Sequence, residues 1–409
     1  MLLQSLLRPV LTPIMRGIFD PAQSIAAAWS PLSLWPDGID SPGMWISPRT
    51  LTSEWQDYTG TTPVATPGTV ADTSNPVGLA LDIRAGAPEV LGPELVVNGD
   101  FSDGSTGWTL FSGATISGGK LIFDQTIYSR AVQSTAPLVA GTTYKVTIVI
   151  DSISVGMVGM QFQGGSNVSG PYFSTAGSHD CYLMGVSGNN TFYFTSDIGG
   201  SNAVVSIVSV KAVPGNHMLQ STSAARPLMS AYDGQTLGPG DTYDATGYPI
   251  YQKYDGVDDG MATASFTAGT LTSSMDLQIP VRRDSLTFGV AGIYCLPTVN
   301  ANVGIFDQAD SSTPSYQNCG TPTVWVDGVQ IASNRAALYN ALTAGDWHIL
   351  EYRGIDASAW VQIQYSALAN YIFFAGARGD IMLYPSTDST ADKDAARQYL
   401  ADYYGVTLP

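Results

Sequence analysis

Short runs in which apolar and polar residues alternate are the feature that most constrains the fold of this chain of 409 residues. The segments YKVTIVIDSISV (144–155) and NAVVSIVSVKAV (202–213) have a period of two and lie between clusters of Gly, Asn and Ser. Such segments, separated by turn residues, are typical of an all-β sandwich. The length is enough for two or three domains, each with its own core. We therefore predict an all-β chain of more than one domain.

The charge of the chain argues against some partners. Charged residues make up 12% of the sequence, and the formal net charge is −17 with only 17 Lys and Arg. A surface that follows nucleic-acid phosphates or anionic lipid needs clustered basic residues, so we expect neither partner. No internal run reaches the 18 or so apolar residues of a membrane span, and we predict none. Nearly every carboxylate is an Asp, which favours turns over helices.

The first 29 residues, MLLQSLLRPVLTPIMRGIFDPAQSIAAAW, form an apolar tail. Arg8 and Arg16 interrupt the run and no basic region precedes it, so a cleaved signal peptide is the less favoured interpretation. Pro9 and Pro13 preclude a long regular helix. The tail either packs on its own domain or docks into a larger assembly. We expect the second, because exposed apolar segments usually mark interaction sites.

The three cysteines do not predict a disulfide framework. Cys181, Cys295 and Cys319 leave at least one thiol unpaired, and their spacing matches no zinc or redox motif. We expect buried, apolar thiols, with a Cys295–Cys319 bridge as the alternative.

The sequence reads as one domain interrupted by another. The segments ISPRTLTSEWQDYTGTTPV (46–64) and VGLALD (77–82) are followed by a Gly- and Pro-containing hinge, and GNHMLQSTSAARP (215–227) with YDGVDD (254–259) continue the pattern. Placed end to end, residues 42–84 and 215–409 resemble the concanavalin/laminin-G sandwiches of bacteriophage and prophage tail and other virion proteins. The C-terminal segment GDIMLYPSTDSTADKDAARQYLADYYGVTLP (379–409) resembles the last strand and closing helix of that family.

The closing helix also has its own signals. Ser389 and Asp392 have the spacing of a capping box, and Gly405 marks the end. We expect the helix to cover an edge or a face of the sandwich. The residues expected to share its buried face are Ala395, Ala396, Leu400 and Tyr403.

The inserted module begins PELVVNGDFSDGSTGWTLF (93–111), and this opening resembles carbohydrate-binding jelly rolls. The matching residues are Asn98, Gly99, Phe101, Gly107 and Trp108. Family members often have an acidic side chain after the Phe that helps hold a structural calcium. This chain has Ser102 there, so the resemblance does not extend to that calcium.

Together these resemblances imply two β-sandwich (jelly-roll) domains, one inserted into the other, with an apolar N-terminal tail and a short C-terminal helix. The predicted boundaries are a docking tail at 1–29, a first sandwich part at 30–88, the carbohydrate-binding-like insert at 89–213, and the rest of the sandwich at 214–409.

No catalytic constellation stands out, and we expect that the chain is not an enzyme. Laminarinase-like concanavalin members use clustered carboxylates, whereas this chain has four scattered Glu, at positions 54, 89, 94 and 351. The histidines at 179, 217 and 348 are far apart, and there is no G-x-S-x-G motif. The ARGD sequence at 377–380 leads into a strand and is assigned no function.

One acidic cluster remains open to more than one interpretation. Asp255, Asp258 and Asp259 are spaced as a tight polar turn between two strands, which we favour over a catalytic pair. The same carboxylates could ligate Ca²⁺, the one cofactor that the sequence suggests.

Sugar recognition needs aromatic rings together with a few hydrogen-bonding side chains. Candidates in the insert are Phe162, Gln163, Tyr172, Phe173, Tyr182, Tyr193 and Phe194, with Asn167 and Asn189 nearby. Since half of these must face the core, we select Tyr172, Phe173 and Tyr182, and interpret Trp108 as a core residue. For each selected residue, packing alone is the alternative.

The family resemblance implies a bacteriophage virion protein, an exposed tail, baseplate or fibre component that contacts glycans or proteins of the host surface. A purely structural or capsid-decoration protein is the first alternative, and a glycan-degrading enzyme is the second. The expected partners are other virion proteins, through the tail, and a host receptor. The expected location is the virion surface, after assembly in the host cytoplasm. Homo-oligomers, trimers among them, are an analogy with such fibres.

Overall fold

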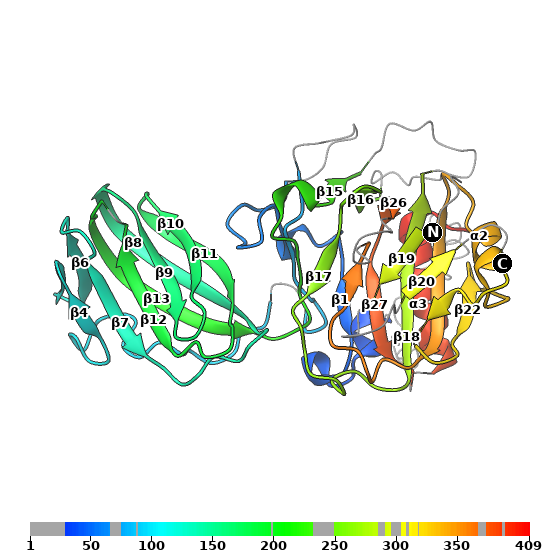
Figure 1. Cartoon of the computed structure of the whole chain (residues 1–409), viewed down its shortest axis with the longest axis horizontal. Coiled ribbons are helices and arrows are strands. Elements are labelled where there is room, and N and C mark those ends of the chain that lie inside the picture. Colours follow the sequence, from blue (N-terminus) through cyan, green and yellow to red (C-terminus); the bar gives the residue numbers. More distant parts are fainter. Residues whose placement is uncertain are drawn as a thin grey trace, which may run out of the picture.

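The computed structural model describes residues 29–65, 75–86, 89–197, 199–231, 249–284, 291–295, 304–307, 311–317, 319–366, 374–386 and 389–409. Residues 1–28 of the predicted docking tail lie outside this set. Within it, strands in four antiparallel sheets dominate, with the α-helices α2 (Arg335–Ala341) and α3 (Thr390–Tyr404). The all-β prediction is confirmed. Figure 1 shows two β-sandwich bodies joined where the chain crosses between them.

The larger body, the split sandwich, contains two sheets. Its nine-stranded sheet has the order β15 (Leu228–Ser230), β16 (Tyr251–Asp255), β26 (Ala375–Arg378), β18 (Met275–Arg283), β24 (Trp347–Ile355), β22 (Thr323–Val326) and β23 (Val329–Ile331), with β27 (Ile381–Pro385) joining β18 to β1 (Met44–Ile46). Its eight-stranded sheet has the order β2 (Glu54–Trp55), β3 (Leu79–Ala80), β14 (Met218–Leu219), β17 (Met261–Thr263), β25 (Gln364–Tyr365), β19 (Ala291–Cys295), β20 (Gly304–Asp307) and β21 (Tyr316–Gln317).

The nine-stranded sheet is covered on both faces. One face contributes to the largest apolar core, and the other lies under α3 and the segment from Trp29 to Trp35. All nine residues of β18 are buried, although its sequence MDLQIPVRR alternates apolar and polar residues. The polar side chains are covered on the second face, where Gln278 donates to the Lys393 carbonyl of α3 at 2.9 Å. Pro280 lies inside β18, where the neighbour of this strand changes from β27 to β26. The Pro280 carbonyl accepts from the Gly379 N–H at 2.9 Å, between β26 and β27. Proline has no N–H to donate, and at this change of neighbouring strand the sheet does not need one.

The closing helix has the predicted caps. The Ser389 hydroxyl accepts from the Asp392 N–H at 3.1 Å, and Gly405 ends the helix with φ of 71°. Its buried face differs slightly from the predicted one, because Ala395 and Tyr403 are only half-buried. The buried residues are Ala396, Arg397, Leu400, Ala401 and Tyr404. The helix covers a face of the nine-stranded sheet, as expected. Neither α2 nor α3, the α-helices of the described part, has the length and apolarity that a bilayer crossing demands.

The smaller body, the inserted sandwich, contains two five-stranded sheets. One has the order β10 (Val168–Phe173), β9 (Val158–Gln163), β12 (Thr191–Ser196), β7 (Arg130–Ser134) and β4 (Thr109–Phe111). The other has the order β11 (Gly177–Met184), β8 (Thr143–Val155), β13 (Asn202–Val213), β6 (Lys120–Asp124) and β5 (Ala114–Ser117). Trp108 belongs to the core between them, with its ring 5.7 Å from that of Phe101, as its position in the motif predicted.

The insertion is visible in the strand pairing. β3 is the last strand of the split sandwich before the insert, and β14 is the first strand after it. These two strands pair directly, with Ala80 opposite Met218. Among the described residues, every strand from β4 to β13 pairs only within the inserted sandwich. The precise ends of the predicted domains stay predictions.

Two further sequence interpretations can be compared with the structure. Cys181 and Cys319 are buried free thiols, so the alternative of a Cys295–Cys319 bridge is wrong. Burial raises the pKa of each of these two thiols to about 12. Within ARGD, Arg378 and Asp380 are fully buried, which excludes display of this sequence on the surface.

Candidate functional site

The three predicted sugar contacts occupy three different environments. Tyr182, on β11, is 4% exposed and lies between the two sandwiches. Its ring is 4.7 Å from that of Trp55, and its hydroxyl donates to Glu89 at 2.8 Å. A sugar needs an open ring face, so a sugar contact at Tyr182 does not fit this placement. The residue instead connects the two bodies.

Phe173 points into the inserted sandwich. It is opposite Val158, a core residue of β9, and its ring stacks on that of His179 at 4.5 Å. The side chain is half-buried and packs against the core cluster. The structure therefore gives Phe173 a packing role at the edge of the sandwich.

Tyr172 points to the outer side of the β10–β4 sheet. It is opposite Gly159, and a side chain at Gly159 would meet the Tyr172 ring at 3.2 Å, so the ring leans over this glycine. Its hydroxyl accepts from the Gln161 amide at 3.2 Å, and Gln161 accepts in turn from Gln163 at 3.0 Å. The Tyr172 hydroxyl oxygen thus accepts from Gln161, and its proton is still available to donate to a further partner.

The same outer side carries more planar and polar groups. Tyr193 is opposite Gln161, and the Arg130 guanidinium lies 5.4 Å from the Tyr193 ring and 4.5 Å from that of Phe111. Asp197 follows β12, and burial, then its charge, raise the pKa of the Tyr172 hydroxyl. Nε of Arg130 and Oδ1 of Asp197 are buried without a hydrogen-bond partner among the described residues.

We call this surface the β10 face and define it as Tyr172, Gln161, Tyr193, Arg130 and Asp197. It combines aromatic rings with side chains that can donate and accept hydrogen bonds. Tyr172 and Tyr193 lie two strands apart, about 10 Å, on one side of a sheet. Such a surface can stack on the apolar faces of sugar rings and bond their hydroxyl groups. Adjacent residues of a strand point to opposite sides, so alternation could have selected Tyr193 over Phe194 and Tyr172 over Phe173. This choice requires knowing which side of each strand faces the core, and the sequence alone did not show that.

The structure brings Asp255, Asp258 and Asp259 together in the turn between β16 and β17. One carboxylate oxygen of each lies within 4.8 Å of the others, close enough for a single cation. The cluster is also a hydrogen-bonded turn, in which Asp259 accepts from the Asp255 N–H at 2.9 Å and Asp255 accepts from the Val257 N–H at 2.7 Å. Burial, then the two neighbouring carboxylates, raises the pKa of Asp259 to about 7. The predicted turn is confirmed, and calcium binding stays a prediction.

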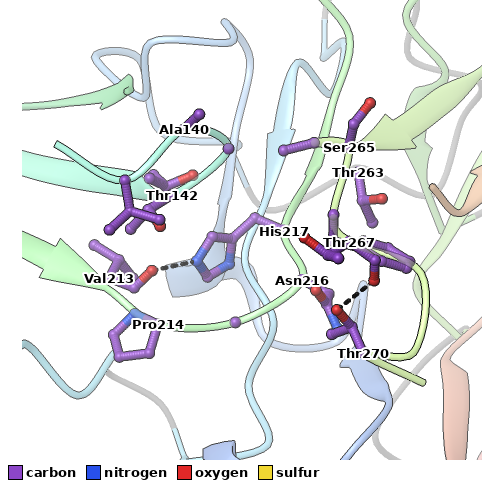
Figure 2. Close-up of a pocket in the computed structure, with 16 residues that line it drawn as sticks. Ala140, Thr142, Val213, Pro214, Asn216, His217, Thr263, Ser265, Thr267 and Thr270 are labelled. Atoms are coloured by element: carbon purple, nitrogen blue, oxygen red, sulfur yellow. Dashed lines mark hydrogen bonds between the residues drawn. The ribbon is translucent and has the colours of Figure 1, made fainter. Parts of the chain in front are cut away.

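A hollow of about 540 Å³ lies where the two bodies meet, with His217 in its wall (Figure 2). His217 is 3% exposed, Nδ1 accepts from the Asp82 N–H at 3.0 Å, and Nε2 bonds the Val213 carbonyl at 2.9 Å. Both ring nitrogens are therefore engaged by the backbone, and burial lowers the pKa of His217. The hydroxyls of Thr263, Ser265 and Thr270 also line the hollow. This arrangement ties the insertion point together and gives the histidine no free nitrogen for catalysis.

One constellation that the sequence did not indicate links Asp327, His348 and Thr343. His348 lies 2.7 Å from the Asp327 carboxylate through Nδ1 and 2.8 Å from the Thr343 hydroxyl through Nε2. The order of groups is that of a hydrolase triad. However, the Thr343 N–H also donates to Nε2 at 3.1 Å, and the hydroxyl bonds Asp346 at 2.8 Å. These bonds fasten the loop after α2 to the turn before β23, which is a structural role.

Comparison with known proteins adds little. No protein-family model and no curated protein matches the sequence. Among solved structures, the tandem CBM22-1–CBM22-2 domain of Paenibacillus barcinonensis Xyn10C is similar with 8% identity and a TM-score of 0.24, over 73% of this chain and 98% of that one. An anti-sigma factor domain-containing protein has 9% identity and a TM-score of 0.13, over 84% and 98%. At these TM-scores neither likeness supports an argument about fold or function.

Proposed function

We propose that the chain is a non-catalytic virion protein of a bacteriophage or prophage, exposed on a tail, baseplate or fibre, that binds a glycan of the host surface through its inserted sandwich. The phage origin rests on the sequence resemblance of residues 42–84 and 215–409. Residues 1–29 would dock the protein into the particle, and an oligomer, a trimer among the options, would present several copies.

The observation that carries glycan binding is the β10 face. It holds the rings of Tyr172 and Tyr193 with the polar groups of Gln161, Arg130 and Asp197 on one side of a five-stranded sheet. Arg130 and Asp197 each keep a buried polar atom without a partner among the described residues. These two atoms are buried, so a hydroxylated ligand would instead bond the polar groups at the surface of the face, the Tyr172 hydroxyl and the Gln161 amide.

The test is binding of the full chain to a panel of bacterial surface polysaccharides, measured by glycan array and calorimetry. Tyr172→Ala and Tyr193→Ala should each weaken binding about tenfold, the effect of roughly 1.4 kcal/mol of lost stacking. Tyr128→Ala is the matched control, because Tyr128 is 56% exposed in a loop of the same sandwich, outside the β10 face. Binding that all three variants retain would place the site elsewhere.

The alternative is a structural or decoration protein. It predicts that the full chain binds no member of the panel, and that removal of residues 1–29 alone prevents incorporation into particles. The calcium proposal belongs to either function, because Asp255, Asp258 and Asp259 lie in the split sandwich, away from the β10 face.

A further inference from the structure

A second hollow, which we call the inter-sandwich groove, lies between the two bodies and has a volume of about 670 Å³. One wall consists of the start of β10 and the end of β11, and the other of β14, β17 and β25 with the loop that carries Tyr58. The lining includes the side chains of Tyr58, Asn167, Ser169, Gln362 and Gln364. The groove therefore exists only because one sandwich is inserted into the other.

The two walls are held in a fixed relation. The Tyr182 N–H donates to the Thr59 carbonyl at 2.7 Å across the boundary, next to the contact between the Tyr182 and Trp55 rings. Gly60 lies so close to Tyr182 that a side chain there would meet the ring at 2.3 Å. The loop itself is ordered by Asp57. Burial opposes ionisation of Asp57, but bonds from Thr59 and residues 61–62 outweigh it and hold its pKa below the usual value.

The lining is uncharged although the chain carries a net charge of −17. Among the described residues that line the groove, none is Asp, Glu, Lys, Arg or His. Gln364 donates to Gln362 at 3.1 Å, and Gln362 donates to the Thr263 carbonyl at 2.6 Å, so these amides form a short ladder along one wall. Phosphates or other ions would find no countercharge here, whereas amides suit neutral hydroxyl groups.

Two side chains in the groove are available to a ligand. Tyr58 is 43% exposed, and the amide of Asn167 is exposed and makes no side-chain hydrogen bond among the described residues. A partly exposed phenol ring and a free amide on the opposite wall can hold a sugar ring between them.

The groove lies next to the β10 face. Ser169 lines the groove, and it is also the residue opposite Gln161, whose amide bonds Tyr172. Two residues, Gly170 and Pro171, separate Ser169 from Tyr172, and the strand register shifts between them, so the path along β10 is about 7–10 Å. A ligand that stacks on Tyr172 and continues along this strand therefore enters the groove.

We propose that the inter-sandwich groove is a second subsite for a linear, neutral oligosaccharide, so that both sandwiches contact one glycan chain. This inference rests on the proposed glycan-binding function. It makes the length of the ligand a determinant of affinity, because a short oligosaccharide occupies the β10 face alone.

The experiment uses the full chain and the neutral polysaccharide of the panel that it binds, cut into oligosaccharides of two to eight units. Calorimetric titration compares the wild type, Tyr58→Ala, Asn167→Ala, Tyr172→Ala and the control Tyr128→Ala. The groove variants should weaken binding of the longest oligosaccharides about tenfold and leave the shortest unchanged, while Tyr172→Ala should weaken both. Because Tyr58 and Asn167 are exposed, both variants should keep the wild-type melting temperature.

If both groove variants keep the wild-type affinity for oligosaccharides of every length while Tyr172→Ala loses binding, the groove is not a second subsite. The proposed function would remain intact. A lowered melting temperature with unchanged affinity would also overturn the second subsite, by showing that protein groups occupy the groove. Absence of glycan binding by the wild type would overturn the proposed function and this inference together.

Discussion

Replacement of Tyr182 tests whether the two sandwiches are fastened as the structure indicates. In Tyr182→Phe the hydroxyl that donates to Glu89 is lost, and hydrogen bonds to charged groups contribute about 1.5–3 kcal/mol. Glu89 keeps its ion pair with Lys145 at 2.9 Å, so we expect the lower end, about 1.5 kcal/mol. In Tyr182→Ala the ring packed against Trp55 and the apolar cluster is lost as well, at about 3–5 kcal/mol.

Amide hydrogen exchange measures this cost directly. The N–H of residue 182 bonds the Thr59 carbonyl across the boundary, so its exchange reports separation of the two bodies. We expect about tenfold faster exchange in Tyr182→Phe and on the order of 1,000-fold in Tyr182→Ala, since 1.4 kcal/mol corresponds to tenfold. The amide of Ile148, inside the inserted sandwich on β8, is the internal control and should keep its rate. Equal rates at residue 182 in wild type and Tyr182→Ala would refute a fixed boundary.

Three other predictions concern the framework. At pH 8, Ca²⁺ should raise the melting temperature relative to EDTA, and this effect should disappear as the pH falls through about 7, where Asp259 becomes protonated. Asp258→Asn should abolish the effect of Ca²⁺. An equal response to Ca²⁺ in that variant would exclude the cluster as the binding site. His217→Gln should lower the free energy of unfolding most above pH 6.5 and less below it, because the neutral imidazole is the form that the fold binds and protonation of the unfolded chain removes its advantage; a pH-independent difference in urea titrations would contradict this. Glu351→Gln should cost about 3–5 kcal/mol in denaturant unfolding, because Glu351 is fully buried and accepts from Arg397 and Arg353; a cost below 1 kcal/mol would contradict this.

The elements that the sequence predicted are those with a local signal, either alternation of apolar and polar residues or capping residues at a helix end. Alternation in 144–155 and 202–213 identified β8 and β13, because each has one face on the core of the inserted sandwich. Capping at Ser389 and Gly405 identified α3 to within a residue. β18 (MDLQIPVRR) alternates as well, but the alternation does not reveal that its polar face is also buried, under the layer that contains α3.

The surroundings of the candidate site residues could not be predicted, because they depend on contacts between residues that are distant in the sequence. Tyr182 meets the loop at Thr59, more than a hundred residues earlier, and no local pattern encodes this neighbour. The same holds for Asp327, which reaches His348 through the pairing of β22 with β24. Of the three selected sugar contacts, only Tyr172 lies on the open side of its sheet. Adjacent residues of a strand point to opposite sides, so Tyr172 and Phe173 could not both have served.

The two places where the chain crosses between the sandwiches are held together by hydrogen bonds, and this affects how a bound glycan would act on the split sandwich. Asp82, which follows β3, accepts from the Asn216 N–H at 2.8 Å and bonds the Arg84 guanidinium, and its own N–H donates to His217. The entering and leaving strands are therefore fastened to each other and to the split sandwich within a few residues of the crossing. An insert on a flexible linker would bind glycan independently of its carrier. An insert fastened at both ends transmits force and orientation, so a glycan bound in the inter-sandwich groove would pull on the split sandwich as well. If the chain attaches a particle to a surface as proposed, force on a bound glycan would reach the split sandwich through these contacts.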